Sequence, residues 1–117
     1  MDKEVKLIHH EFKKFDEGKP QFSDLPQLAL LETVKAFNYG AKKYNKFNYS
    51  SGTDYLRYYD ACQRHLHSWI MHEDMDESGN HHISHAIASL MMLLETIKLG
   101  KGNDNRNPNY IFLNNGK

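Results

Sequence analysis

The chain has 117 residues and one cysteine, and its 15 Lys and Arg balance 15 Asp and Glu. This length predicts one domain, and a lone cysteine excludes an internal disulfide framework. A protein that grips a long nucleic-acid backbone usually carries a basic excess, which is missing here, so we expect no long nucleic acid as a partner. A small phosphorylated ligand needs only a few cations and fits this composition.

The distribution of apolar residues indicates a protein outside the membrane. The most apolar segment, Ile87 to Leu94, is far shorter than the roughly 20 residues that a membrane helix needs. The N-terminus shows no charged stretch followed by an apolar run, which predicts no secretion signal. Because the single Cys62 suits a reducing compartment, we expect a soluble, cytoplasmic protein without a membrane partner.

Helical spacing of apolar residues predicts the first two elements. A short helix is predicted from Lys3 to Phe15, before a turn at Gly18 and Pro20. A longer helix is predicted from about Pro26 to Tyr44, capped by Ser23 or Asp24. Its apolar residues recur on one side: Leu28, Leu31, Val34, Phe37 and Ala41.

After a loop from Asn45 to Gly52, a further helix is predicted to run to about His72, with Thr53 or Asp54 as its cap. The residues that form its apolar face are Tyr55, Tyr58, Tyr59, Cys62, Leu66, Trp69 and Ile70. The last helix is predicted from Asn80 or His81 to Leu99, with Gly100 ending it. Its apolar stripe consists of Ile83, Ile87, Leu90, Met91, Leu94 and Ile97.

No segment alternates like a strand, so the fold class is predicted as all-α. The Asn- and Gly-rich segment from Lys101 to Lys117 predicts an extended arm or a disordered tail. Its apolar island, Tyr110 to Leu113, could dock on the domain or on a neighbouring subunit. The predicted organisation is a domain over residues 1–100 followed by an arm over 101–117.

Most of the eight histidines lie between Arg64 and Ala86. His65, Trp69 and Glu73 are spaced by four residues, and His82 and His85 by three, so each set shares one helix face. A short turn predicts that the two helices pair antiparallel. Several ligand types then converge at one end of the bundle: Glu73, Asp76, Glu77, His82 and His85.

Such a convergence is typical of a metal site between helices, and carboxylate oxygens suit Mg²⁺ or Mn²⁺. Other interpretations stay open at this point. The acidic run over 74–77 also fits a solvated turn, and the two histidines also fit a structural role. Lys42 and Lys43 also fit a solvated helix end, Trp69 fits core packing, and Arg64 fits an internal ion pair.

Four ordered motifs resemble those of the dATP/dGTP diphosphohydrolase domain family, a phage-type member of the MazG-like superfamily. They are Gly40-Ala41-Lys42-Lys43-Tyr44, Arg64-His65-Leu66 with Trp69, the acidic run from Glu73 to Gly79, and His82-x-x-His85-Ala86. Gly18-Lys19 and Leu25-Pro26 also fit the opening of the family. The resemblance covers roughly residues 16–99.

The resemblance implies an all-α, MazG-like bundle of three to four helices per chain, assembled as a dimer or tetramer. It implies hydrolysis of a purine deoxynucleoside triphosphate, dATP or dGTP, to the monophosphate and pyrophosphate with Mg²⁺ or Mn²⁺. A phage-encoded chain would act in the host cytoplasm.

Roles follow for individual residues under this hypothesis. Glu73 and Asp76, with Glu77, His82 or His85, would bind the metal, and His65 would orient the water. The residues expected to contact the substrate are Lys19, Lys42, Lys43 and Arg64 at the phosphates, and Tyr44 or Trp69 at the base.

One departure from the superfamily keeps alternatives open. Glu73 and Asp76 fit an E-x-x-D motif, but no E-x-x-E pair stands upstream, because Glu32 is followed by Lys35 at the matching position. Which residues hold the metal therefore stays open. The same departure motivates a second hypothesis, a protein that sequesters a signalling nucleotide without cleaving it. A third is a helical interaction module with incidental histidines.

Overall fold

A computed structural model describes residues 13–112 of the chain. In this range it forms η1 (Phe22–Asp24), α2 (Gln27–Tyr44), η2 (Asn48–Ser51), α3 (Tyr55–Ile70) and α4 (His82–Lys98). The described part contains isolated β-bridges and no strand, which confirms the predicted all-α class. No described helix is long and apolar enough to cross a membrane. The helix predicted from Lys3 lies outside the described residues except at positions 13–15, which are not helical.

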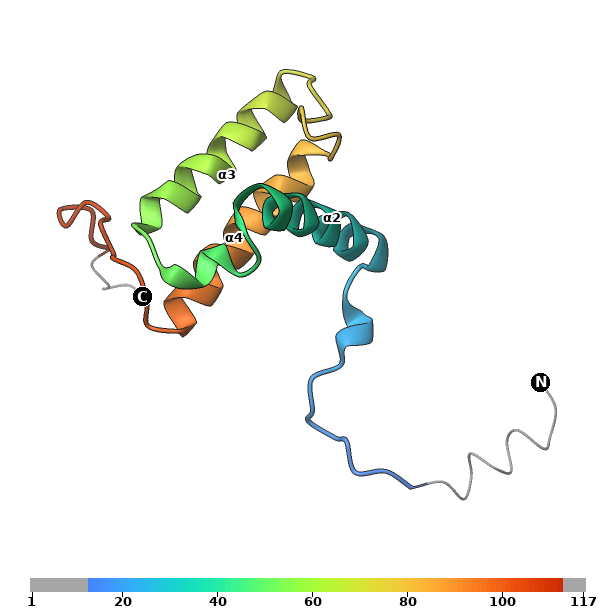
Figure 1. The fold of residues 1–117 in the computed structure, drawn as a ribbon. Helices are drawn as coiled ribbons and strands as arrows, with labels where there is room; N and C mark the ends of the chain where they lie inside the picture. Colours follow the sequence, from blue (N-terminus) through green and yellow to red (C-terminus); the bar gives the residue numbers. More distant parts are fainter. Residues whose placement is uncertain (1–12, 113–117) are drawn as a thin grey trace.

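α4 is the central helix of the fold. Figure 1 shows α3 and α4 as an antiparallel hairpin, with α2 crossing α4. α4 packs against both of the other helices. Its buried residues are small or polar and lie on two opposite sides of the helix: His82, Ala86, Ser89 and Thr96 on one, Ser84 and Ala88 on the other. Because these side chains are short, the neighbouring helices can approach α4 closely.

Two similar backbone motifs end α3 and α4. After α3, His72 adopts a left-handed conformation with φ 73°, and Glu73 N donates to the Ser68 carbonyl at 3.0 Å. After α4, Gly100 has φ 69° and Lys101 N donates to the Thr96 carbonyl at 3.0 Å. Both match the Schellman motif, which satisfies the last carbonyls of a helix. The predicted stop at Gly100 is confirmed, and α3 ends two residues before the predicted His72.

The predicted cap of α2 is wrong, whereas Asp54 occupies the predicted N-cap position of α3. Ser23 and Asp24 belong to η1, and α2 begins after Pro26 without a side-chain cap. Asp54 does precede α3, but its side chain caps no backbone N–H.

The segment after α4 caps α3 instead. Tyr55 N donates to the Asn103 carbonyl at 2.9 Å, and Leu56 N donates to Asn105 Oδ1 at 3.1 Å. These bonds satisfy donors that a helix start leaves without a partner. The beginning of the predicted arm therefore packs against the domain, and a cap from 50 residues away cannot be found in local sequence.

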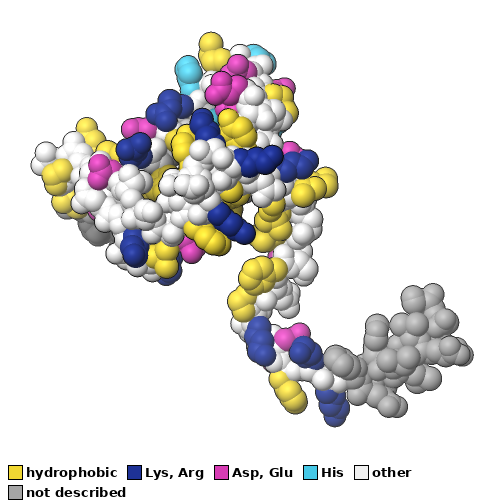
Figure 2. Space-filling view, in the orientation of Figure 1, with side chains coloured by type: hydrophobic (Ala, Val, Ile, Leu, Met, Phe, Trp, Pro, Cys, Tyr) yellow, Lys and Arg dark blue, Asp and Glu magenta, His cyan; other side chains and the backbone are white. Residues whose placement is uncertain are grey.

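The predicted apolar stripes exist, but much of each faces outward. Leu28 on α2 is 83% exposed, Leu94 on α4 is 61% exposed, and Ile70 on α3 is 62% exposed. The largest fully buried side chain in the described part is Thr96. Figure 2 shows hydrophobic side chains on the surface around the start of α2 and the segment leading into it. Within residues 13–112, one chain therefore leaves much of each apolar stripe uncovered.

The close approach at Gly102 gives a test of this arrangement. A Cβ at Gly102 would lie 2.5 Å from the Thr53 carbonyl oxygen and 3.0 Å from Thr96 Cγ2, whereas a Cβ at Gly100 would meet nothing within 4 Å. Both glycines have positive φ, so Gly100→Ala controls for backbone strain. We expect Gly100→Ala to lower the free energy of unfolding by about 1 kcal/mol and Gly102→Ala by about 2–4 kcal/mol, measured by denaturant titration. Equal losses would contradict the close packing of this segment.

Candidate functional site

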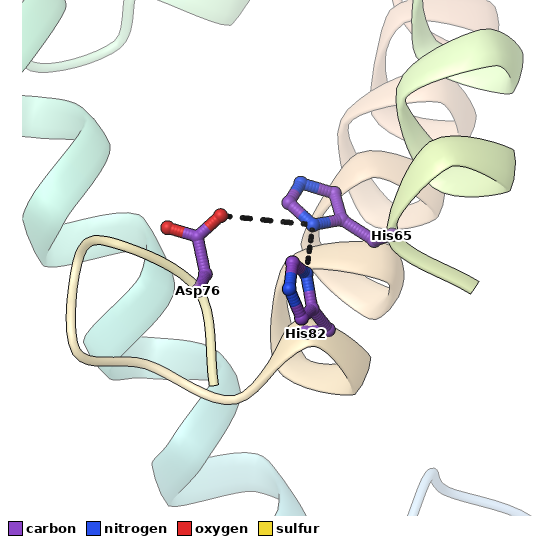
Figure 3. Close-up of side chains that lie close together, drawn as sticks. All are labelled: His65, Asp76 and His82. Atoms are coloured by element: carbon purple, nitrogen blue, oxygen red, sulfur yellow. Dashed lines mark hydrogen bonds and ion pairs between the residues drawn. The ribbon is translucent and has the colours of Figure 1, made fainter. Parts of the chain in front are cut away.

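The segment between α3 and α4 brings a cluster of metal-binding side chains together. His65 comes from α3, Asp76 from the connecting segment and His82 from the first turn of α4 (Figure 3). His65 Nδ1 lies 2.8 Å from His82 Nδ1 and 3.9 Å from Asp76 Oδ2. Each residue offers one ligand atom, and these atoms lie within 4.8 Å of one another. The sequence prediction of a convergence here is therefore correct in its location.

A tight turn holds the Asp76 carboxylate in place. Ser78 N donates to Asp76 Oδ1 at 2.7 Å, which is the pattern of an Asx turn. Asp76 N donates to the Asn80 carbonyl at 2.8 Å, and Gly79 between them has φ 87°. Glycine adopts this backbone conformation without steric cost. The Asp-Glu-Ser-Gly sequence therefore forms a turn in which Asp76 Oδ2 faces His65 and Asp76 Oδ1 faces His85.

Glu73 fixes the orientation of His82. The His82 ring is buried, and its Nε2 donates to Glu73 Oε1 at 2.9 Å. This bond selects the neutral tautomer whose Nδ1 carries the lone pair, and that lone pair faces His65. A carboxylate behind a histidine is the usual arrangement at metal sites. The geometry thus favours an orienting role for Glu73, which we expected among the direct ligands.

His85 extends the cluster toward α2. Its Nε2 lies 2.8 Å from Ser78 Oγ and 3.8 Å from Asp76 Oδ1, and its ring stacks on His65 with 4.9 Å between centroids. Tyr39 of α2 meets the His85 ring edge-on at 6.1 Å. Sequence reasoning missed Ser78 and Tyr39 as site residues. The Asp-x-Ser spacing of the Asx turn could have indicated Ser78, but no local signal marks Tyr39.

Burial and neighbouring groups lower pKa values in the cluster, which favours the protonation states that bind a cation. Burial lowers the pKa of His65, as do His85 and His82, and burial also lowers the pKa of His85. Burial alone would raise the pKa of Asp76, but hydrogen bonding from Ser78 outweighs it, so the pKa is lowered. Neutral imidazoles beside an ionised carboxylate are the protonation states that metal binding requires.

Lys43 is the predicted phosphate-binding cation that lies beside the cluster. Its Nζ lies 5.8 Å from the Tyr39 ring centroid and 5.3 Å from that of Tyr44. Tyr44 and Tyr39 raise its pKa, with a smaller contribution from the carboxylate of Glu77. Glu77 itself is exposed and outside the His–Asp group. Figure 2 shows the histidine and acidic side chains together at this end of the α3–α4 hairpin.

The other predicted substrate contacts lie farther away. Arg64 lines an open groove on α3 with Asp60 and His67, although its charge contributes to the lowered pKa of His65. Lys42 is exposed at the end of α2. Lys19 lies in the segment that leads away from the helices in Figure 1. Trp69, at 42% exposure, is neither core nor part of the His–Asp group.

The donor set suits one of the two expected ions better than the other. Mg²⁺ prefers oxygen ligands and keeps several waters. Two imidazoles and one carboxylate suit first-row transition metals, and Mn²⁺ accepts both donor types. The residues present therefore fit a divalent cation, with Mn²⁺ favoured over Mg²⁺.

Metal binding can be measured without any substrate, from the electron paramagnetic resonance signal of free Mn²⁺. We expect Asp76→Asn and His82→Ala to weaken Mn²⁺ binding by more than the roughly 10- to 100-fold typical of losing a group that orients a ligand, and Glu73→Gln to fall within that range. His67→Ala, on the open groove of α3, serves as the matched control and should bind like the wild type. Equal Mn²⁺ binding by all four variants would rule out this cluster as the site.

Comparisons with known proteins agree with this picture. Residues 9–106 match the family described as dATP/dGTP diphosphohydrolase, N-terminal. A protein of Salmonella phage PMBT28 named dATP/dGTP diphosphohydrolase is 31% identical over 94 residues, covering 80% of this chain and 32% of that protein. The chain thus spans about a third of that relative's length. No solved structure matches the chain. By both its family match and its phage relative, the chain belongs to the dATP/dGTP diphosphohydrolase N-terminal family.

Proposed function

We propose that this chain hydrolyses a purine deoxynucleoside triphosphate, dATP or dGTP, to the monophosphate and pyrophosphate. The observation that carries the proposal is the His65–Asp76–His82 group, with ligand atoms within 4.8 Å of one another, in a chain whose phage relative is named for this activity. The alignment covers only a third of that relative, so the activity for which the whole relative is named is a proposal for this chain.

The proposed cofactor is Mn²⁺, with Mg²⁺ as the weaker substitute. His65, Asp76 and His82 would hold it, and His85 lies close enough to Asp76 to join them. A divalent cation at such a site supplies charge neutralisation at the phosphates and a more acidic bound water.

The residues of the chain have separate tasks in this proposal. Lys43 neutralises phosphate oxygens. Its ammonium group lies beside the cluster, near the rings of Tyr39 and Tyr44. The imidazole of His85 accepts a hydrogen bond from the water that attacks the α-phosphorus, and its lowered pKa favours the neutral ring. Pyrophosphate leaves on the opposite side of the phosphorus. Ser78 holds His85 in position.

A nucleotide panel tests the activity. The purified chain is incubated with each NTP and dNTP and Mn²⁺ or Mg²⁺, and products are separated by ion-pair chromatography. We expect monophosphate and pyrophosphate from dATP or dGTP, and a loss of at least roughly 100-fold in kcat/KM for Asp76→Asn, since the proposed metal site loses its charged ligand. Asp74→Asn changes the same charge two residues away, outside the group, and should keep full activity.

A nucleotide sponge or sensor is the second candidate. It is favoured by the presence of a single carboxylate in the three-residue group, where the superfamily uses several. Under this hypothesis, a nucleotide added with Mn²⁺ is bound tightly and recovered uncleaved after prolonged incubation. Turnover of that nucleotide by the wild type, lost in Asp76→Asn, would exclude it.

We also propose that copies of the chain assemble through the exposed apolar faces of α2 and α4. Leu28, Leu31 and Val34 follow one another along one side of α2, and all three are exposed. The outward face of α4 carries a similar set, which consists of Leu90, Met91, Leu94 and Ile97. Exposed apolar surface of this extent marks interaction sites, and the apolar side chains buried within residues 13–112 are small, so their burial gives little hydrophobic stability to a single chain. A second copy would cover both faces.

Light scattering coupled to size exclusion tests the assembly. We expect the wild type to elute as a dimer or tetramer and Leu31→Glu to shift it to monomer or to unfolded chain, because a buried unpaired carboxylate is strongly unfavourable. Gln63→Glu adds the same charge on the open groove of α3 and should leave the assembly intact. A folded wild-type monomer at micromolar concentration would contradict the proposal.

A further inference from the structure

An aromatic pocket lies between α2, η2 and the α3–α4 hairpin, outside the His–Asp cluster. Its volume is about 360 Å³, and its walls include Phe37, Tyr44, Tyr49, Tyr58 and Met92. Phe37 and Tyr49 meet edge-on at 6.1 Å, so the wall presents both a ring face and a ring edge. Ligand pockets start at about 300 Å³, so this pocket suits a ring-sized group rather than a whole nucleotide.

The rim of the pocket offers hydrogen-bonding groups without partners. The side chains of Asn38, Asn45 and Asn48 line it, and none of them makes a hydrogen bond among residues 13–112. An asparagine amide carries the adjacent donor and acceptor that match the N6 and N7 edge of adenine. A planar heterocycle with such an edge is therefore the ligand whose chemistry this pocket matches.

Two strained residues form the loop at the mouth of the pocket. Asn45 has φ 103° and Phe47 has φ 64°, and neither is glycine. A left-handed conformation costs on the order of 1 kcal/mol or more in a residue with a side chain, most of all in a bulky aromatic. Phe47 nonetheless packs edge-on to Tyr49 at 6.5 Å. Because strain of this kind collects at binding sites, the loop conformation is a second observation in favour of a ligand.

Gly40 keeps the pocket open. It lies inside α2, where glycine is less favourable than alanine by roughly 1 kcal/mol, and it lines the pocket. A Cβ added at Gly40 would meet nothing within 4 Å. No crowding inside the chain therefore accounts for glycine at this position, and the space in front of it is available to a ligand.

The distance from this pocket to the His–Asp cluster suits a nucleotide. Tyr58 precedes His65 by seven residues on α3, and Met92 follows His85 by seven residues on α4. Seven residues are two helical turns, so the pocket lies on the same side of the hairpin, about 10 Å from the cluster. Tyr44 of the pocket and Lys43 beside the cluster are neighbours on α2.

We propose that the pocket lined by Phe37, Gly40 and Tyr44 binds the purine base of the nucleotide whose phosphates lie at the His–Asp cluster. This inference rests on the proposed function and assigns the base to α2 and η2 rather than to Trp69. The ring stacks on the aromatic wall, and the asparagine amides contact its edge. The sugar then lies along the last turn of α2, next to Lys43.

Separate ligands for the two ends of the nucleotide test the proposal. Binding of α,β-methylene-dATP and of inorganic pyrophosphate, each with Mn²⁺, is measured by calorimetry for the wild type, Gly40→Leu and Tyr44→Ala. Leucine at position 40 fills the pocket while improving helix propensity, and Tyr44 is already half exposed, so both variants should fold. We expect both to bind the nucleotide analogue at least about tenfold more weakly, as the loss of base stacking predicts. The affinity for pyrophosphate should be unchanged in Gly40→Leu, whereas Tyr44→Ala also removes a ring beside Lys43 and should weaken pyrophosphate binding by a smaller factor than it weakens binding of the analogue.

Three results would overturn the proposal: unchanged affinity for the analogue in both variants, an equal loss of pyrophosphate affinity, or a change of assembly state in Gly40→Leu with nucleotide binding intact. The last result would assign the pocket to a second copy of the chain.

The outcome of this test is separable from that of the proposed reaction. Wild-type hydrolysis with unaffected pocket variants would leave the function standing and reject the pocket. Weaker nucleotide binding by the pocket variants, together with no hydrolysis by the wild type, would support the pocket and reject the proposed reaction.

Discussion

The close approach of α3 and α4 is the constraint on which the rest of the structure depends. Ala86 and Ser89 on α4, and Cys62 on α3, are small and buried, which allows the two helices to lie near each other. At the end of the hairpin where the two helices are connected, the same proximity leaves 2.8 Å between the Nδ1 atoms of His65 and His82. A larger residue near this end of the hairpin would move the rings of His65 and His82 apart, so the His–Asp group would no longer form. The short side chains of α4 are thus a requirement of the site as well as of the packing.

The small residues also explain where the apolar side chains go. A helix that buries alanine and serine against its own chain has its leucines and methionines left for another surface. On α4 the exposed Met91 and Leu94 lie away from the side that carries the buried Ala86 and Ser89, and the exposed Leu90 borders that side. Intrachain packing and surface hydrophobicity are therefore not in conflict in this fold. They belong to different parts of the surface of the same helix, which is the arrangement that the proposed assembly with a second copy would use.

Sequence periodicity predicted the helices well and their burial poorly, and the two outcomes have one cause. Hydrophobic spacing reports that a helix has an apolar side, but it does not report which surface covers that side. Leu28 and Leu94 therefore supported correct helices, although both side chains are exposed in the described part of the chain. The position of the metal-binding cluster was predictable because the i, i+3 and i, i+4 spacings and a short turn leave little freedom. The division of labour between Glu73 and Asp76 was not, because it depends on the Asx turn at Ser78 and on the tautomer of His82.

The cluster and the aromatic pocket share the α3–α4 hairpin, but the pocket also depends on α2 and η2, and this difference has a consequence for specificity. The cluster needs only the α3–α4 hairpin, whose turn is held by hydrogen bonds within residues 73–82. The pocket needs α2 and the strained loop at Asn45 and Phe47. Substitutions in that loop can reshape the surface offered to a base without moving His65, Asp76 or His82. Under the proposed function, a fold organised in this way would change the nucleotide it selects while it keeps the same phosphate chemistry.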